Sequence, residues 1–125
     1  MDKNLVSWFE IPVIDMNRAK QFYDAVFEIN IAIHDLEGLQ MGWFPMNPEK
    51  SGASGSLVKH KEYIPSETHG PVLYFSCLDV VNELSRVEAA GGSILKPKTG
   101  IGGGYGFMAL VKDTEGNRIA LHSNQ

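Results

Sequence analysis

Hydrophobic and polar residues alternate along residues 5–14, which predicts a strand with one face in a core. The residues expected to face the core are Phe9, Ile11 and Val13, and those on the opposite face are Trp8 and Glu10. Asp15 then stands at a helix N-cap position, and apolar residues recur at helical spacing over residues 16–27. The pattern therefore predicts a strand that leads into an amphipathic helix across a short turn.

A second copy of this pattern begins about half the chain later. Residues 72–78 alternate in the same way, and Asp79 takes the N-cap position of a helix over residues 80–90. Gly91 and Gly92 follow this helix, in the manner of a C-cap. The chain therefore contains one supersecondary unit twice.

Shorter alternating segments complete each half. They predict strands at residues 30–35, 39–46, 56–60, 93–96, 107–112 and 118–123. Turn-forming residues stand between them, at Glu37-Gly38 and at residues 113–117, where Gly116 supplies a positive φ. Each half thus reads strand, helix and three strands. The sequence predicts one α+β domain of two βαβββ modules, with module one at about residues 1–60, a connector at 61–70 and module two at 71–125.

One face of each predicted sheet is covered by its helix, and the other face is free to curve around a cleft. The residues expected on the covered face are Phe9, Ile11, Val13, Phe75, Cys77, Ile119 and Leu121. Those expected on the cleft face are Trp8, Glu10, Val72, Tyr74, Ser76, Arg118, Ala120 and His122. A half of this size is marginal on its own, so the two halves are expected to share buried surface. Polar and aromatic groups in a concave site are typical of a small-molecule pocket.

Composition narrows the class of protein. The chain has 125 residues, 43% of them hydrophobic, and a formal net charge of −4 without any run of Lys or Arg. A nucleic-acid or anionic-membrane surface needs a basic footprint, so neither partner is expected. The apolar runs are too short to span a bilayer, and the start of the sequence has no signal-type apolar region. The single Cys77 excludes an internal disulfide and indicates a reducing, cytoplasmic location.

Three segments of the chain resemble those of a known superfamily. They are Val13-x-Asp15 with Phe22-Tyr23, Asp79 with Ala89-Ala90-Gly91-Gly92, and Asp113-Thr-Glu-Gly-Asn-Arg-Ile119. With the βαβββ repeat, they resemble the vicinal oxygen chelate superfamily, which includes glyoxalase I, bleomycin-resistance proteins and extradiol dioxygenases. The resemblance covers nearly the whole chain. It implies paired curved sheets around a cleft, each module curled into half a barrel, and a homodimer.

The metal ligands of this superfamily are missing at the positions where the resemblance would place them. Its metal enzymes carry a His or Glu on several barrel strands, and the corresponding residues here are Trp8, Val72 and Ala120. The predicted fourth strand has no carboxylate or imidazole at residues 55–59. None of these side chains binds a divalent cation. The sequence therefore predicts no cofactor of the standard metal type, and whether the protein is an enzyme stays open.

Glu10 is the first candidate for chemistry. Strand parity puts it on the cleft face beside Trp8, where desolvation would raise its pKa and suit it to act as a general base. The alternative is a structural carboxylate, paired with Arg118 or solvated at the cleft mouth.

His122 is the second candidate, because it shares the parity of Ala120. It is positioned to form an acid–base couple with Glu10, or to join Glu10 in a displaced metal site, although two ligands make a weak site. The alternative is that His122, three residues before Gln125, is an ordinary surface histidine. His34, His60 and His69 show no regular spacing and are expected to be exposed, and the face taken by Lys59 and His60 stays open.

The remaining candidates are residues expected to line the cleft. Trp8 and Tyr74 are expected to supply aromatic surface, and Ser76 and Arg118 polar contacts. The glycine-rich loop at residues 100–106 lacks the ending of a P-loop and opens no helix. It is interpreted as a flap that brings Tyr105 over a ligand, or as a plain connector.

Two functional hypotheses follow. The first is a metal-independent protein that binds a small organic molecule in the cleft between the modules, as the resemblance to bleomycin-resistance proteins implies. The second is a lyase or isomerase that uses Glu10 with His122 or Arg118, either without metal or with a displaced metal. The missing ligands favour the first hypothesis.

Overall fold

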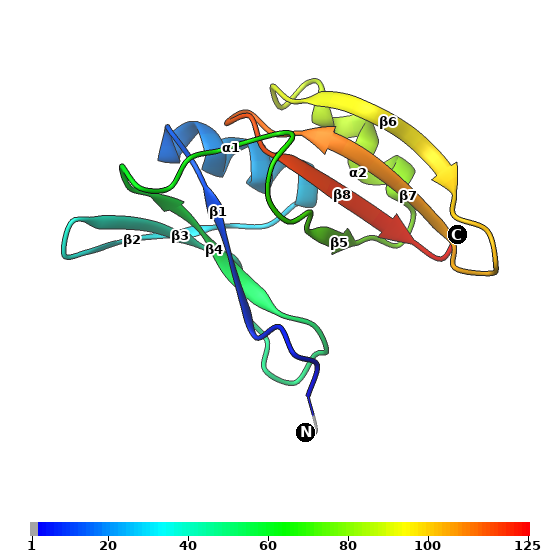
Figure 1. Ribbon diagram of the computed structural model, residues 1–125, viewed down its shortest axis with the longest axis horizontal. Helices are drawn as coiled ribbons and strands as arrows, with labels where there is room; N and C mark the ends of the chain where they lie inside the picture. The colour runs from blue at the N-terminus through cyan, green and yellow to red at the C-terminus, as the bar shows by residue number, and fades with distance from the viewer. Residues whose placement is uncertain (1–2) are drawn as a thin grey trace.

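The computed structural model describes residues 3–125 and consists of two four-stranded sheets and two helices (Figure 1). The first sheet contains β1 (Trp8–Pro12), β4 (Ser54–Lys59), β3 (Leu39–Trp43) and β2 (Ala32–Leu36), in that spatial order, with α1 (Met16–Phe27). The second sheet contains β5 (Tyr74–Ser76), β8 (Arg118–Ser123), β7 (Phe107–Lys112) and β6 (Ser93–Gly100), with α2 (Val80–Val87). Residues 1 and 2, at the start of predicted module one, lie outside the described residues.

The two sheets repeat one topology. In each, the first and last strands of the module pair in parallel, β1 with β4 and β5 with β8, and the other neighbours pair antiparallel. Strand, helix and three strands therefore occur twice, and the predicted α+β fold of two similar βαβββ modules is confirmed. Figure 1 shows the two sheets diverging from the region where β1 ends and β8 begins.

Both helices begin where an aspartate caps them. The Asp15 side chain accepts a hydrogen bond from the Arg18 backbone N–H at 3.1 Å, and that of Asp79 accepts one from the Val81 N–H at 3.0 Å. These bonds satisfy N–H groups that have no partner within the helix. The two positions predicted as N-caps are confirmed.

Several strand ends differ from the predicted ones; β3, for example, ends at Trp43 rather than at residue 46, and β5 is limited to Tyr74–Ser76. The first strand was expected over residues 5–14, but β1 is limited to Trp8–Pro12, because its partner β4 begins at Ser54 and pairs it with Trp8. Beyond Pro12, the backbone turns away from the sheet. The expected strand 93–96 extends to Gly100, with register shifts on either side of Lys96 that accommodate Pro97 in an edge strand.

The second helix is shorter than its pattern suggested. It ends at Val87 rather than at residue 90, and Gly91 follows in the left-handed region at φ 98°. The Gly92 N–H then donates to the Val87 carbonyl at 3.0 Å, which closes the helix end in the manner of a Schellman motif. Gly92 also has no room for a side chain, since a Cβ there would lie 2.5 Å from the Phe22 ring.

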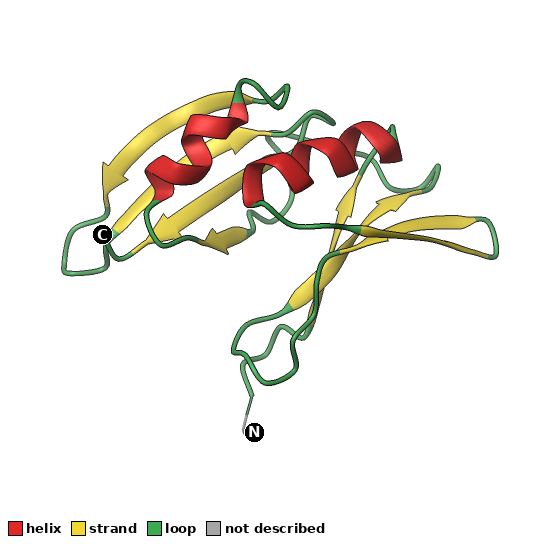
Figure 2. Cartoon of the chain, turned by 180° about the vertical axis from the view of Figure 1, so that it is seen from behind, coloured by secondary structure: helices red, strands yellow, loops and turns green. Residues whose placement is uncertain are grey.

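The two helices lie side by side on the same side of the structure (Figure 2). The buried side of α1 carries Met16, Ala19, Phe22, Tyr23 and Val26. Together with the buried residues of both sheets it forms one hydrophobic core. The two modules therefore share buried surface, as expected of halves that are marginal alone.

Aromatic rings from both modules meet at the junction of the sheets. The Phe75 ring centroid lies 4.8 Å from that of Phe27 and 5.9 Å from those of Phe9 and Phe44. The Tyr23 ring packs against this group, 5.5 Å from that of Phe44. Such pairs stabilise beyond their buried area by about 0.5–1.5 kcal/mol each. This aromatic junction fixes how β1 and β5 face each other.

Neither α1 nor α2, the helices found within residues 3–125, is long and apolar enough to cross a membrane.

Candidate functional site

The predicted faces of the strands match the observed burial. Ile11 and Val13, and Ile119 and Leu121 in β8, are buried on the helix side. On the opposite face Trp8 is 37% and Tyr74 57% exposed, and Glu10 and Ser76 are also exposed. Ala120 is the exception, because it is fully buried between Tyr74 and Leu110, its neighbours across the sheet.

Glu10 has two hydrogen-bond donors, and neither was expected. The Tyr63 hydroxyl donates to its Oε1 at 2.9 Å, and the Trp8 indole N–H donates to its Oε2 at 3.4 Å. The first of these bonds, together with the carboxylate charge, raises the pKa of Tyr63. Within residues 3–125, no hydrogen bond or ion pair joins Glu10 to His122 or Arg118. The structure therefore does not bring the suggested acid–base couple together.

His122 contacts the glycine-rich loop instead. Its Nε2 lies 2.8 Å from the backbone carbonyl of Tyr105, within hydrogen-bond distance. The Tyr105 side chain is 71% exposed. Arg118, at the other end of β8, holds a buried Nε without a hydrogen-bond partner among the described residues. The loop and His122 are neighbours, as the flap interpretation requires, but Glu10 lies on the other sheet.

The positions that correspond to metal ligands do not fit a divalent cation. Trp8, Val72 and Ala120 carry no oxygen, sulfur or imidazole donor. In the described part of the chain, no three His, Cys, Asp or Glu side chains lie together in a way that could hold a metal ion.

A hollow of about 540 Å³ opens between the two modules, and we call it the inter-module cavity. Its lining from module one includes Phe9, Phe27, Phe44 and Ser54, and that from module two includes Leu73, Tyr74, Phe75, Ser76 and Glu83. The volume lies in the range of small-molecule sites. Of the residues predicted for the cleft, Tyr74 and Ser76 line this cavity, whereas Trp8, Glu10, Tyr105, Arg118 and His122 lie outside it.

Sequence reasoning missed the main wall of the cavity. Phe9 and Phe75 were assigned to the helix-covered face, and both are part of the core cluster, yet each is only half-buried and lines the cavity. The sequence feature that could have revealed this wall is the phenylalanine at a core-facing position in the first strand of both modules. A core residue next to a sheet edge can also line a cavity, and the period-two pattern does not distinguish these two roles.

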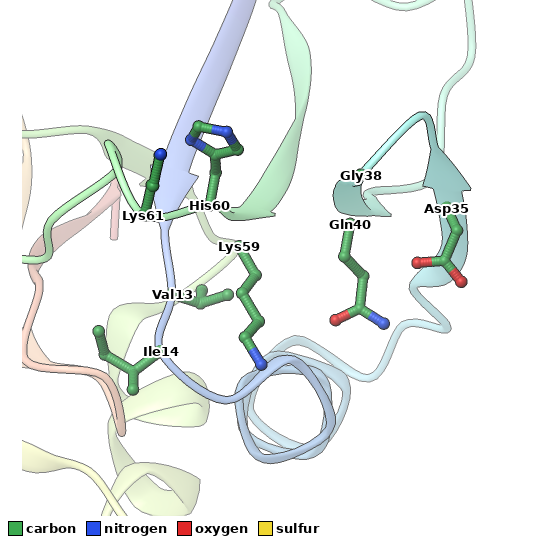
Figure 3. Close-up of a pocket in the computed structure, with 8 residues that line it drawn as sticks. All are labelled: Val13, Ile14, Asp35, Gly38, Gln40, Lys59, His60 and Lys61. Atoms are coloured by element: carbon green, nitrogen blue, oxygen red, sulfur yellow. The ribbon is translucent and has the colours of Figure 1, made fainter.

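A second hollow, of about 700 Å³, lies at the end of the first sheet where β1 and β4 finish, next to Val13 and Ile14 (Figure 3). Lys59, His60 and Lys61 line it after β4, and Asp35 and Gln40 come from the β2–β3 hairpin. Lys59 and His60, whose orientation the sequence left open, both border this hollow, and Figure 3 shows their side chains pointing in opposite directions. Both lysines are exposed to solvent, where salt screens their charge. Because these walls are open to solvent, the hollow has little of the enclosure that a small-molecule site needs.

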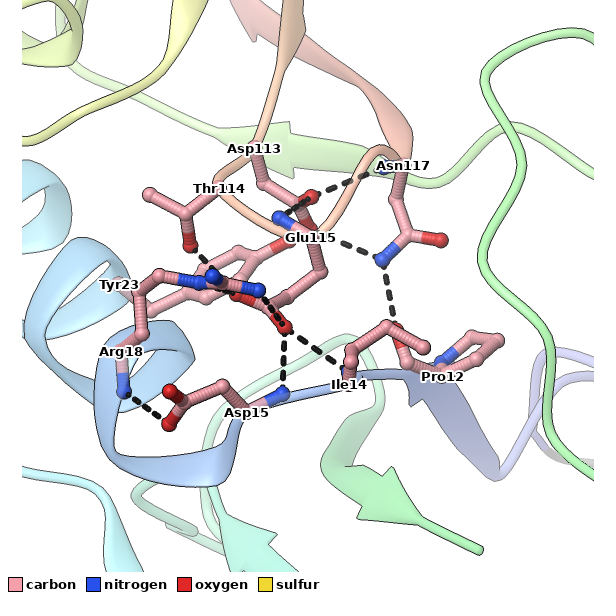
Figure 4. Close-up of polar contacts among 9 residues, drawn as sticks. All are labelled: Pro12, Ile14, Asp15, Arg18, Tyr23, Asp113, Thr114, Glu115 and Asn117. Atoms are coloured by element: carbon pink, nitrogen blue, oxygen red, sulfur yellow. Dashed lines mark hydrogen bonds and ion pairs between the residues drawn. The ribbon is translucent and has the colours of Figure 1, made fainter. Parts of the chain in front are cut away.

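The two modules are joined by a buried carboxylate (Figure 4). Oε1 of Glu115, in the β7–β8 turn, accepts the backbone N–H groups of Ile14 at 2.8 Å and Asp15 at 2.7 Å. Its Oε2 accepts the Arg18 Nε–H at 2.7 Å and the Thr114 hydroxyl at 3.0 Å. The Glu115 side chain is fully buried. The start of α1 is therefore held by the second module.

A second buried carboxylate in the same turn supports this contact. Asp113 accepts the Tyr23 hydroxyl at 2.6 Å and the backbone N–H groups of Glu115 and Asn117 at 2.8 Å. Burial first, and then the Asp113 charge, raises the pKa of Tyr23 well above its ordinary value. The Asn117 side chain also donates to the Pro12 carbonyl at 2.7 Å, at the end of β1. The turn therefore determines how β1 meets the second sheet.

We predict that Glu115 makes the protein acid-sensitive. Burial alone would raise the pKa of Glu115, but the hydrogen bonds from Arg18 and from the N–H groups of Asp15 and Ile14 outweigh it, and the pKa is lowered. A carboxylate whose pKa is lower when folded adds stability above its unfolded pKa and loses it as the pH falls through the folded pKa. Unfolding by urea at pH 7, 5, 4 and 3 should show the wild-type advantage over Glu115→Gln shrinking below about pH 4. An advantage that is constant across this range would contradict the assignment.

The chain is similar to proteins of one known superfamily. The family model described as Glyoxalase/Bleomycin resistance protein/Dioxygenase superfamily matches residues 5–121. No curated protein matches the chain significantly. A glyoxalase I variant from Zea mays superposes with a TM-score of 0.75 at 18% identity, over 94% of this chain and 45% of the maize chain. The chain thus spans about half the length of that enzyme.

Two similar structures match over nearly their full length. An antibiotic-binding protein from Streptomyces sp. CB03234 has a TM-score of 0.70 at 23% identity, covering 98% of both chains. A glyoxalase/bleomycin resistance protein from Albidiferax ferrireducens has a TM-score of 0.69 at 18% identity, covering 96% of this chain and 98% of that one. At these identities the likeness concerns the fold.

Proposed function

The chain belongs to the Glyoxalase/Bleomycin resistance protein/Dioxygenase superfamily, and from this premise we propose that it binds a small organic molecule in the inter-module cavity without a divalent metal. The observation that carries the proposal is the aromatic wall of the cavity. Phe9 and Phe44 from one module and Phe75 from the other line a space of about 540 Å³. Such a surface suits a flat, largely apolar ligand, and the Ser76 hydroxyl is available to orient it.

The metal-free part of the proposal is supported by donor chemistry. The residues at the three corresponding ligand positions are Trp8, Val72 and Ala120, and none of them replaces the His or Glu that a divalent ion requires. A protein of similar fold from Streptomyces is described as antibiotic-binding, so proteins with this fold include ones that bind small molecules. Binding of an organic ligand by this chain is inferred from its own cavity.

A lyase or isomerase that uses Glu10 is less well supported. Glu10 is hydrogen-bonded to Tyr63, and His122 is within hydrogen-bond distance of the Tyr105 carbonyl. For acid–base catalysis both side chains would have to leave these partners and meet across two sheets. We therefore favour binding over catalysis for this site.

The proposal includes a homodimer that acts in the cytoplasm. Large apolar side chains are exposed on several elements, among them Leu5 at 87%, Ile64 at 77% and Leu78 at 83%. A dimer interface that covered these side chains would remove their apolar surface from water. The free, half-buried Cys77 suits a reducing compartment.

The proposal predicts binding of a neutral aromatic probe in the presence of chelator. N-phenyl-1-naphthylamine, whose fluorescence rises in apolar surroundings, should bind wild type with one site per chain in 1 mM EDTA. Ser76→Trp should weaken this binding at least about tenfold, a cost of ~1.4 kcal/mol, because Ser76 is an exposed residue of the cavity wall that a bulky ring would cover. Titration of the fluorescence at constant protein concentration measures both constants.

Ser93→Trp is the matched control, because Ser93 is also an exposed strand residue but lies outside the cavity. It should bind like wild type. Equal affinity in Ser76→Trp and Ser93→Trp would show that the probe does not bind in the cavity. Loss of binding in EDTA would contradict a metal-independent site.

A further inference from the structure

One lining residue of the inter-module cavity is unlike the rest. Glu83, in the first turn of α2, is the charged residue among the described residues of the lining, and its side chain is only 15% exposed. Its Oε1 is buried without a hydrogen-bond partner within the described chain. A desolvated carboxylate with an unsatisfied oxygen is costly unless a cation or donor accompanies it.

The only ion pair of Glu83 in the described structure is weak. Its Oε2 lies 3.8 Å from Nη2 of Arg86, one turn further along α2. Arg86 is also engaged elsewhere, since its Nε donates to the Val26 carbonyl at 2.8 Å and its Nη1 lies 3.7 Å from Oε1 of Glu28. One guanidinium is therefore shared between two carboxylates and a backbone carbonyl. Glu83 keeps an uncompensated part of its negative charge.

The neighbouring thiol shows the same negative field. Burial first, then the charge of Glu83 and a hydrogen bond between the thiol and Glu83, raise the pKa of Cys77 to about 12. Cys77 therefore stays neutral at ordinary pH, and its thiol, which also donates to the Phe75 carbonyl at 3.6 Å, offers Glu83 only a weak S–H donor. It also supplies no cation to neutralise Glu83.

The other walls of the cavity suit a cation as well. The rings of Phe27, Phe75 and Phe44 lie within 6 Å of one another in succession, with Phe75 in the middle. The faces of aromatic rings attract ammonium groups, by about 0.5–2 kcal/mol depending on desolvation. No Lys or Arg contributes to the described lining, so no side chain of the wall takes the place of a ligand cation.

From these observations we infer that the cavity selects an organic ammonium ion, an amine with an apolar or aromatic body, and that Glu83 is the residue that recognises its charge. The inference rests on the proposed function, because it specifies the ligand class of the same cavity. The ammonium group competes only with the 3.8 Å contact to Arg86, and the aromatic walls hold the body of the ligand.

Three naphthalene derivatives of nearly equal size test the inference at pH 7. They are 1-naphthylmethylamine, which is cationic, 1-naphthylmethanol, which is neutral, and 1-naphthoate, which is anionic. With wild type, calorimetric titration should give the amine a Kd at least about tenfold below that of the alcohol, the size of one charge-assisted contact. The naphthoate should bind more weakly than the alcohol.

Glu83→Gln keeps the size of the side chain and removes its charge. It should bind the amine and the alcohol within about twofold of each other, with the affinity for the alcohol unchanged. Glu88→Gln is the matched control, because Glu88 is an exposed glutamate just beyond α2. It should keep the wild-type preference for the amine.

The outcomes separate the two proposals. If wild type binds the amine and the alcohol equally, or if Glu83→Gln keeps the preference, charge recognition by Glu83 is wrong while binding in the cavity stands. If wild type binds none of the three compounds, the proposed function fails and this inference fails with it. The comparison in wild type needs no variant, so it decides even if Glu83→Gln does not fold.

Discussion

Glu115→Ala is expected to lower the free energy of unfolding by about 3–5 kcal/mol, the range for breaking one side of a buried, charged hydrogen-bond network. The change removes the acceptor of the Ile14 and Asp15 backbone N–H groups. It also leaves the Arg18 guanidinium without the carboxylate that lies 2.7 Å from its Nε. Because these donors come from one module and Glu115 from the other, the loss should concern the whole fold rather than one turn.

Urea or thermal unfolding followed by circular dichroism measures this loss. Glu115→Gln is the informative partner variant, because its amide keeps one acceptor oxygen but no charge, and its loss should lie between those of wild type and Glu115→Ala. Asp24→Ala is the matched control, since Asp24 makes its contacts to Lys20 and to the Ile31 N–H, both within the first module. A loss below about 1 kcal/mol in Glu115→Ala, the value of one ordinary hydrogen bond, would contradict the central role of this carboxylate.

The elements were predictable from the sequence because their causes are local. Asp15 and Asp79 cap their helices through N–H groups two or three residues away. The turn at 113–117 was predicted from Gly116, which has φ 95°. The role of Glu115 in that turn was not predicted, because its partners at Ile14 and Arg18 are about a hundred residues away along the chain. Sequence patterns show which residues form a turn but not what the turn contacts.

The candidate site was predictable only in part, for the same reason. Parity correctly placed Trp8, Glu10, Tyr74 and Ser76 away from the helices. The partners of these residues come from irregular segments, however. Tyr63, from the connector at 61–70, hydrogen-bonds Glu10, and its position follows from no periodic pattern. Whether Glu10 is a base or a fixed carboxylate depends on such a contact.

The cavity depends on how the two sheets diverge, which no pattern within one module specifies. Phe9 and Phe75 have the same parity in their modules, and the repeat alone assigns both to the core. In the structure their ring centroids are 5.9 Å apart across the junction. Both roles, core and wall, follow from this one arrangement. The same residue therefore contributes to stability and, under the proposed function, to ligand contact, and the two can be separated by experiment.

Phe75→Ala is expected to cost about 3 kcal/mol of stability, at the lower end for truncating a phenylalanine in a core because Phe75 is half-buried. It removes the ring that packs against Phe27 at 4.8 Å and against Phe9 and Phe44 at 5.9 Å. It should also weaken binding of N-phenyl-1-naphthylamine at least about tenfold, because the ligand loses its central aromatic contact. Chemical unfolding and fluorescence titration measure the two effects on the same preparation.

Phe107→Ala shows whether the two effects have one cause. Phe107 is also half-buried in a strand, but its ring lies under the Lys98 ammonium group at 4.5 Å and outside the cavity. Its truncation should lower stability while leaving probe affinity at the wild-type value. If both truncations weakened the probe equally, the loss would follow from general loosening of the fold, and Phe75 would not be part of the binding wall. If only Phe75→Ala weakened it, the aromatic junction that joins the modules would also be the surface that holds the ligand.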